Sequence, residues 1–365
     1  VPNTLAAISK AITGAYLSSG GNAFSTRTAS MIVQEHFPPS ANTVGLESGP
    51  LFGVQFSQLP CSDLSERFST AGNTIGPKRA PLGLSADPGG FPLYKNGVVV
   101  GGIGVSGDDD YGFDPEIIDF DTSDEELIAI AGMSGFAAPQ SIRANRISVD
   151  GTTLRFSDMD ESDLMTDPAS ARSFTALNGT LGALRGVNGY FALGAPTILA
   201  GEIYSSESSG MRPAMTAEYA DEDVFVLTDG SGANRFPPRA GTDALSNPAP
   251  LTEPEVRTLI EEAFDVMTRA RAQIRRPLES RAQVSISVVD THGQILGIVR
   301  SPDAPIFGTD VSLQKARTAT FFSGSDAASD LVGANRSPNF GAVPNTNVRS
   351  RVQGVRHFLA DPASL

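Results

Sequence analysis

The chain has 365 residues and a formal net charge of −14, with 40% hydrophobic and 19% charged residues. This length and composition are typical of a folded protein of about two domains and argue against a disordered chain. The acidic charge also argues against nucleic acid and anionic membrane as partners, because both are bound through clusters of Lys and Arg.

Helix and hairpin patterns fill the first part of the chain. Ser25 is typical of a helix cap, Asn96-Gly97 of a hairpin turn, and Ser123 with Glu126 of a capping box. The elements predicted here are helices over residues 4–18, 26–36 and 123–136, a strand over 49–60, and hairpins over 91–105 and 145–158, the second turning at Asp150-Gly151.

Residues 166–250 are rich in Gly, Pro and Ser and are interpreted as an irregular connecting region. Thr252 is a suitable helix cap, and Pro254 is tolerated in a first turn. The elements predicted in this half are strand-like pieces at 189–204 and 223–230, helices within 246–274, at 309–322 and at 347–361, and a hairpin over 283–300 that turns at His292-Gly293.

Glycines are concentrated in the second strand of the first predicted hairpin, at Gly101, Gly102, Gly104 and Gly107. A glycine inside a strand packs nothing, so it marks a place where something approaches the backbone closely. A neighbouring helix is the favoured explanation, and the edge of a flat ligand is the alternative.

Residues 9–18 align without gaps with residues 314–323, which pairs Lys10 with Lys315 and Tyr16 with Phe321. A constant offset over ten residues indicates a distant duplication. The chain would then contain the later part of a first copy and the early part of a second copy.

Placed together, the segments "VSISVVDTHGQILGIVR", "QKARTATFFS", "GGFPLYKNGVVVGGIGVSG" and "DEELIAIAG" resemble the GlcG/HbpS-like haem-binding family. The resemblance implies an α+β fold, in which helices pack on an antiparallel sheet and the protein assembles into oligomers. It divides the chain into a later part of one module (1–165, with an acidic insertion at 108–123), the connecting region (166–250) and an early part of a second module (251–365). Residues 140–250 and 324–365 have no evident family counterpart.

The first hypothesis is an exported, non-enzymatic protein that binds haem or another tetrapyrrole, a ligand that the resemblance implies. The alternative is a structural or assembly protein that keeps the fold without a cofactor, and a small-molecule enzyme is the third hypothesis. His36 and His357 are the candidate axial ligands, and the resemblance places Gly101, Gly102 and Gly104 against the ligand. Each histidine also has a structural explanation, and His292 is expected to be exposed in a turn.

An acidic run offers the hard oxygen ligands that Ca²⁺ prefers, although solvation is the usual role of such a run. Its candidate ligands are Asp108, Asp109, Asp110, Asp114, Asp119 and Asp121. Residues 157–163 are a weaker candidate. The sequence lacks a GxSxG elbow, a P-loop and a CxxCH motif, and Asp290 lies too close to His292 to form a triad with it alone.

The composition, acidic and poor in Lys, suits an exported bacterial protein, periplasmic or secreted. The single cysteine, Cys61, excludes an internal disulfide. If the duplication is real, the first module lacks its opening hairpin and exposes a sheet edge, which soluble proteins avoid. We expect residues 283–300 to pack beside 91–105 in one composite sheet, within the chain or from a neighbouring copy, or an additional chain to complete the sheet.

Overall fold

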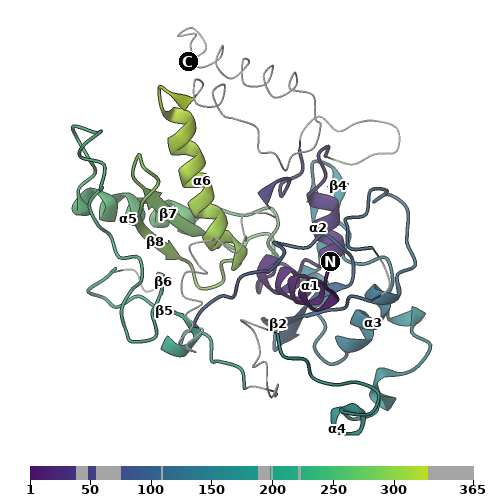
Figure 1. The fold of residues 1–365 in the computed structure, drawn as a ribbon. Helices are drawn as coiled ribbons and strands as arrows, with labels where there is room; N and C mark the ends of the chain where they lie inside the picture. Colours follow the sequence, from purple (N-terminus) through teal and green to yellow (C-terminus); the bar gives the residue numbers. More distant parts are fainter. Residues whose placement is uncertain are drawn as a thin grey trace.

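Figure 1 shows the computed structural model of the chain, which describes residues 1–37, 48–54, 75–107, 110–187, 198, 200–220 and 223–327. Helices and antiparallel sheets make up this part, so the predicted α+β class is confirmed. Within it, no helix is long and apolar enough to cross a membrane. The predicted helix at 347–361 and Cys61 lie outside the described residues.

The N-terminal half is built around α1 (Asn3–Leu17), which lies on the hairpin of β1 (Gly90–Lys95) and β2 (Val98–Gly104). Asn96 and Gly97 have φ angles of 52° and 80°, and the predicted turn is confirmed. The other elements of this half are α2 (Thr26–Ile32), α3 (Asp124–Gly132), β3 (Ser148–Val149), β4 (Thr152–Thr153) and the short α4 (Phe174–Leu177).

Two predicted elements of this half need correction. The second helix ends at Ile32 and not at residue 36, although Ser25 caps it as predicted. Residues 49–54 form turns rather than a strand, and Leu51 in that turn is buried in the core. Residues 55–60 of the predicted strand lie outside the described residues. The alternation of apolar residues over 49–54 therefore reflects the burial of side chains in a turn, and not a pleated strand.

The C-terminal half is a sheet covered by a helix on each face (Figure 1). Its strands lie in the order β5-β6-β8-β7. The elements are β5 (Met211–Pro213), β6 (Phe225–Leu227), α5 (Glu253–Arg269), β7 (Ser285–Val289), β8 (Ile295–Arg300) and α6 (Phe307–Ser323). Thr252 caps α5 through a capping box with Glu255, and Pro254 lies in the first turn, as predicted.

Alternation along β7 divides its side chains between the two helices. Ile286 and Val288 pack in the core that α5 covers, whereas the hydroxyls of Ser285 and Ser287 contact α6. The predicted hairpin is therefore confirmed. The predicted composite sheet is wrong within one chain, because β1-β2 and β7-β8 belong to different sheets of the described structure.

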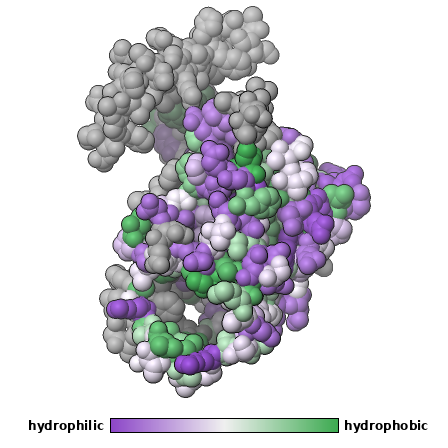
Figure 2. Space-filling model, turned by 90° about the vertical axis from the view of Figure 1, so that its right-hand side faces the viewer, coloured by the Kyte–Doolittle hydropathy of each residue, from purple (hydrophilic) through white to green (hydrophobic). Residues whose placement is uncertain are grey.

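Short 3-10 helices connect these elements, at Gln140–Ile142, Ala144–Arg146, Glu161–Asp163, Pro168–Ser170 and Glu207–Ser209. The two halves meet where Arg275 binds Asp303 at 2.6 Å and donates to the hydroxyl of Ser19 at 3.0 Å. The face in Figure 2 is hydrophilic over broad areas, with hydrophobic residues in smaller patches, in keeping with the acidic composition.

Candidate functional site

The glycines of β2 lie under α1. A Cβ at Gly102 would lie 1.9 Å from the carbonyl oxygen of Ala11, and one at Gly104 would lie 2.2 Å from that of Ala7. Real Cβ atoms do not approach so closely, so only glycine lets the helix lie this near to the strand. Gly101, in contrast, has open space where its side chain would be. The favoured explanation, close helix packing, is confirmed at Gly102 and Gly104, and a ligand contact at any of the three stays a prediction.

The described histidines are both on the surface. His36 is exposed after the end of α2, and His292 is exposed at the β7-β8 turn, where Nε2 lies 2.7 Å from the hydroxyl of Ser246. His357 lies outside the described residues. The role of His36 and His357 as axial ligands stays a prediction.

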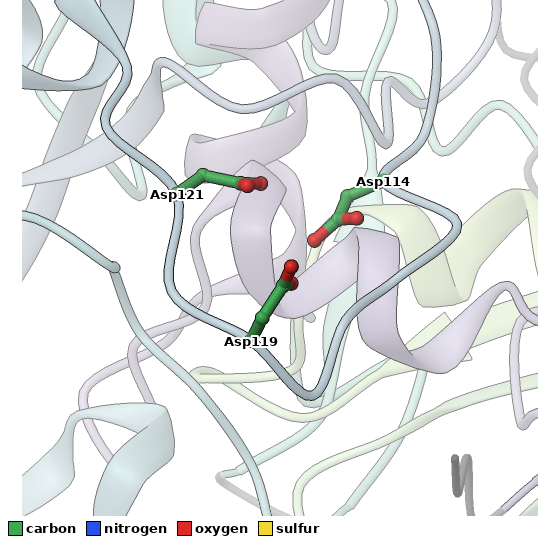
Figure 3. Close-up of side chains that lie close together, drawn as sticks. All are labelled: Asp114, Asp119 and Asp121. Carbon is green, nitrogen blue, oxygen red and sulfur yellow. The ribbon is translucent and has the colours of Figure 1, made fainter.

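Three carboxylates of the acidic run converge, as Figure 3 shows. One oxygen from each of Asp114, Asp119 and Asp121 lies within 4.8 Å of the others. Asp110 is exposed, and Asp108 and Asp109 lie outside the described residues. Solvation, the usual role of an acidic run, does not describe Asp114, which is only 9% exposed.

Arg27, on α2, explains why Asp114 is buried. Its Nη1 lies 2.9 Å from Asp114, 3.1 Å from Asp121 and 3.1 Å from Asp158, and its Nε lies 3.4 Å from Glu126. Burial opposes the charge of Arg27, but the carboxylates of Glu126 and Asp158 raise its pKa above the ordinary value. Burial also raises the pKa of Glu126, against the attraction of Arg27. The cluster is thus organised by a cation of the protein, and a bound metal ion stays a prediction.

A second buried ion network surrounds Lys10, the lysine of the repeated segment. Lys10 is fully buried, and its Nζ lies 2.5 Å from Asp87, donates to the carbonyl of Pro88 at 2.7 Å and forms an ion pair with Glu125. Burial raises the pKa of Asp87 although Lys10 opposes this. Glu125 belongs to α3, so the network joins α1, α3 and the segment before β1. Lys10, Asp87 and Glu125 form ion pairs with one another inside the protein, which indicates a structural role for this network.

A cavity of about 340 Å³ opens between β7 and α6. Its wall is mainly apolar, with Ile274, Phe307 and Val311, and the cationic side chains of Arg275 and Lys315 line it as well. Lys315 is exposed, unlike its repeat counterpart in the N-terminal half. The remaining lining residues are Asn22, Ala272, Gln283, Val284, Ser285, Pro305, Gly308 and Ser312.

A larger cavity of about 530 Å³ lies beside α3. Met133 and Met159 line it together with Phe156, whose ring lies 5.1 Å from the guanidinium carbon of Arg143. Burial lowers the pKa of Arg143. Acidic side chains, among them Glu161, line the same cavity, so its character is mixed rather than cationic.

The two cavities meet different requirements of a tetrapyrrole, which is flat and apolar and has carboxylates at one edge. The β7-α6 cavity offers apolar walls with two cations, which fit the ring and its carboxylates. None of its lining residues is a His, Met, Cys or Tyr, the usual axial ligands of haem iron. The α3 cavity offers two such thioethers, on Met133 and Met159. Sequence reasoning missed both cavities. The β7-α6 cavity joins Asn22 to side chains of residues 272–315, and the α3 cavity forms where segments within residues 120–162 pack against one another.

Comparison with known proteins gives one match. Residues 260–354 match the family model described as "Haem degrading protein HbpS-like", so the expectation that residues 324–365 have no family counterpart is wrong for 324–354. Among the described elements, this segment takes in most of α5 together with β7, β8 and α6, so the suspected relationship is confirmed for that module. Neither the curated proteins nor the solved structures gave a significant match.

Proposed function

We propose that this protein binds haem or a related tetrapyrrole, without turnover, in the cavity between β7 and α6. The observation that carries the proposal is the coincidence of two features. The segment that matches the haem-related family model contributes most of the walls of an apolar cavity, and that cavity also has cationic side chains. A volume of about 340 Å³ lies in the range of small-molecule sites.

Each side chain has a definite task in this proposal. Phe307 and Val311 would cover the apolar ring, and Lys315 would bind a carboxylate at its edge. Arg275 already forms an ion pair with Asp303 at 2.6 Å. It would bind the other carboxylate of the ligand only if its guanidinium contacted both groups at once. The iron, when bound, would supply any redox chemistry.

Haemin titration of the purified chain tests the proposal through the Soret band. We expect saturable binding that is about threefold to tenfold weaker in Lys315→Glu, because an exposed ion pair contributes up to about 1 kcal/mol and the substitution turns attraction into repulsion. Lys95→Glu is the matched control, since Lys95 is also exposed and does not line the cavity. Equal weakening in both variants would point to non-specific charge effects and refute the site.

A second candidate function is a structural or assembly protein that keeps the fold without a cofactor. It is favoured by the lack of a usual axial ligand among the residues lining the β7-α6 cavity. The same titration separates the two functions, because this candidate gives no saturable Soret change. Binding that is lost in Met159→Ala and kept in Lys315→Glu would place the ligand in the α3 cavity instead.

The name of the family model also mentions haem degradation. Bound haem should keep its Soret band in air with a reductant if the protein only binds. Progressive loss of that band, faster than for free haemin, would show turnover.

We also propose that the protein acts outside the cytoplasm, in the periplasm or after secretion. Its support is the composition, with a net charge of −14 and few lysines. Fractionation of the source cells with an antibody to this chain tests the location, and a signal confined to the cytoplasmic fraction would refute it.

A further inference from the structure

The cavity of about 530 Å³ beside α3 combines buried apolar side chains with charged ones. Ile130 and Met133 in its wall are 4% and 3% exposed, and Phe156 is 3% exposed. The volume lies in the range of small-molecule sites. The apolar part of the wall would take an apolar group, so the charged part decides which class of ligand fits.

Arg143 brings a positive charge to this cavity. Its guanidinium carbon lies 5.1 Å from the centre of the Phe156 ring, and its Nε donates to the carbonyl oxygen of Ala138 at 3.0 Å. Among the described residues no carboxylate forms an ion pair with it, whereas Arg27 and Arg155 each have one. The ring and the carbonyl orient the guanidinium plane. A guanidinium oriented in this way can bind a carboxylate through two parallel hydrogen bonds.

Glu161 brings the opposite charge to the same wall. It is exposed at the start of its 3-10 helix, and its attraction opposes the lowering of the pKa of Arg143 by burial. The two side chains form no ion pair with each other in the described structure. The neighbouring Asp160 already accepts from the backbone N–H and the hydroxyl of Ser162, at 2.7 and 2.5 Å. A cation and an anion thus line one cavity without direct contact between them.

We infer that this cavity binds a zwitterion with an apolar side chain, namely an α-amino acid or a short peptide. The carboxylate of the ligand would bind Arg143, and its ammonium group would bind Glu161. Its side chain would lie against Ile130 and Met133. A ligand with carboxylates alone would meet Glu161 and Asp160 as well as Arg143, so it would fit less well. The inference goes beyond the proposed function and does not depend on haem, because a different cavity carries it.

Calorimetric titration of the protein with L-leucine, and with the dipeptide leucyl-leucine, tests the inference. Two derivatives separate the charges, because leucinamide lacks the carboxylate and N-acetyl-leucine lacks the ammonium group. We expect saturable binding of leucine or the dipeptide, and binding of each derivative that is weaker than that of leucine by about threefold or more. Tighter binding of the dipeptide would assign the site to peptides, and tighter binding of leucine would assign it to free amino acids. Absence of saturable binding, or derivatives that bind as tightly as leucine, would overturn the inference.

Matched variants locate the site. Glu161→Gln should weaken the binding of leucine by about threefold to tenfold and leave N-acetyl-leucine unchanged, because that derivative has no ammonium group. Glu262→Gln is the control, since Glu262 is exposed on α5 and does not line the cavity. Arg143→Gln should weaken leucine and N-acetyl-leucine by about tenfold to a hundredfold and leave leucinamide unchanged, a selectivity that misfolding would not produce. If Glu161→Gln binds leucine as tightly as the control variant does, the inference is wrong.

Discussion

Replacement of Lys10 by Met should destabilise the N-terminal half strongly. Lys10 is fully buried, and its ammonium group neutralises Asp87 and Glu125, both of which are at most 9% exposed at the side chain. Methionine has a similar volume but no charge, so the two carboxylates would remain buried without a cation.

The expected loss is about 3–5 kcal/mol in the free energy of unfolding, the range for breaking a buried ion pair by removing one partner. For a folding unit of about 150–250 residues this corresponds to a melting temperature lower by about 6–20 °C. Burial already raises the pKa of Asp87, and loss of Lys10 would raise it further. A raised carboxyl pKa favours the folded state at low pH and penalises it as the pH rises through the folded-state value. The deficit of the variant should therefore be larger at pH 7 than at pH 4.

Urea unfolding followed by circular dichroism, at both pH values, measures this effect. The repeat supplies the control, Lys315→Met, at the counterpart position where the lysine is exposed, and we expect a change within about 0.5 kcal/mol. A further variant that combines Lys10→Met with Asp87→Asn and Glu125→Gln should recover part of the loss. If Lys10→Met costs no more than Lys315→Met at pH 7, the ion network does not stabilise the fold and the reasoning is wrong.

Two further predictions concern local packing and pH. Gly102→Ala should lower the free energy of unfolding by more than about 2 kcal/mol, because the new Cβ would overlap the backbone of α1. Gly101→Ala should be close to neutral, because its Cβ would point into open space. Thermal unfolding compares the two variants directly, and equal melting temperatures would contradict the packing argument. Hydrogen bonds from Thr291 and Asn247 lower the pKa of Asp243 to about 2. A lowered carboxyl pKa stabilises the fold above the ordinary value of 3.8 and loses that effect as the pH falls towards 2. The stability advantage of wild type over Asp243→Asn should thus shrink between about pH 4 and pH 2 in urea titrations, and a constant difference would show that these hydrogen bonds do not favour the charged form.

The elements that the sequence predicted correctly are those with local signals. The turn at Asn96-Gly97 needs residues that adopt positive φ, and the cap at Thr252 needs only Glu255 three residues later. The helix that begins after Ser25 ended earlier than predicted, since its C-terminus has no comparable local marker. Ends without caps are decided by tertiary packing, which a sequence pattern does not contain.

The candidate sites were less predictable because they depend on long-range contacts. The acidic run is plain in the sequence, but its organising cation, Arg27, lies 87 residues before Asp114. Glu126 was correctly placed after the cap of α3, yet its side chain accepts from the backbone of Asp158 and pairs with Arg27 rather than closing a capping box. The walls of the β7-α6 cavity come from positions as distant as Asn22 and Lys315.

Lys10 and Lys315 show how one sequence signal produces two environments. Both stand at the same place in a repeated helix, and intrinsic propensity treats them alike. In α1 the helix is covered by the glycine strand, and the carboxylates of Asp87 and Glu125 enclose the lysine. In α6 the corresponding residue remains exposed beside a cavity and a free strand edge. The difference lies in what covers the helix. Within the described residues, α6 lies on β7, whose sequence SISVV has no glycine, and so it has no counterpart of the glycine strand that lies against α1.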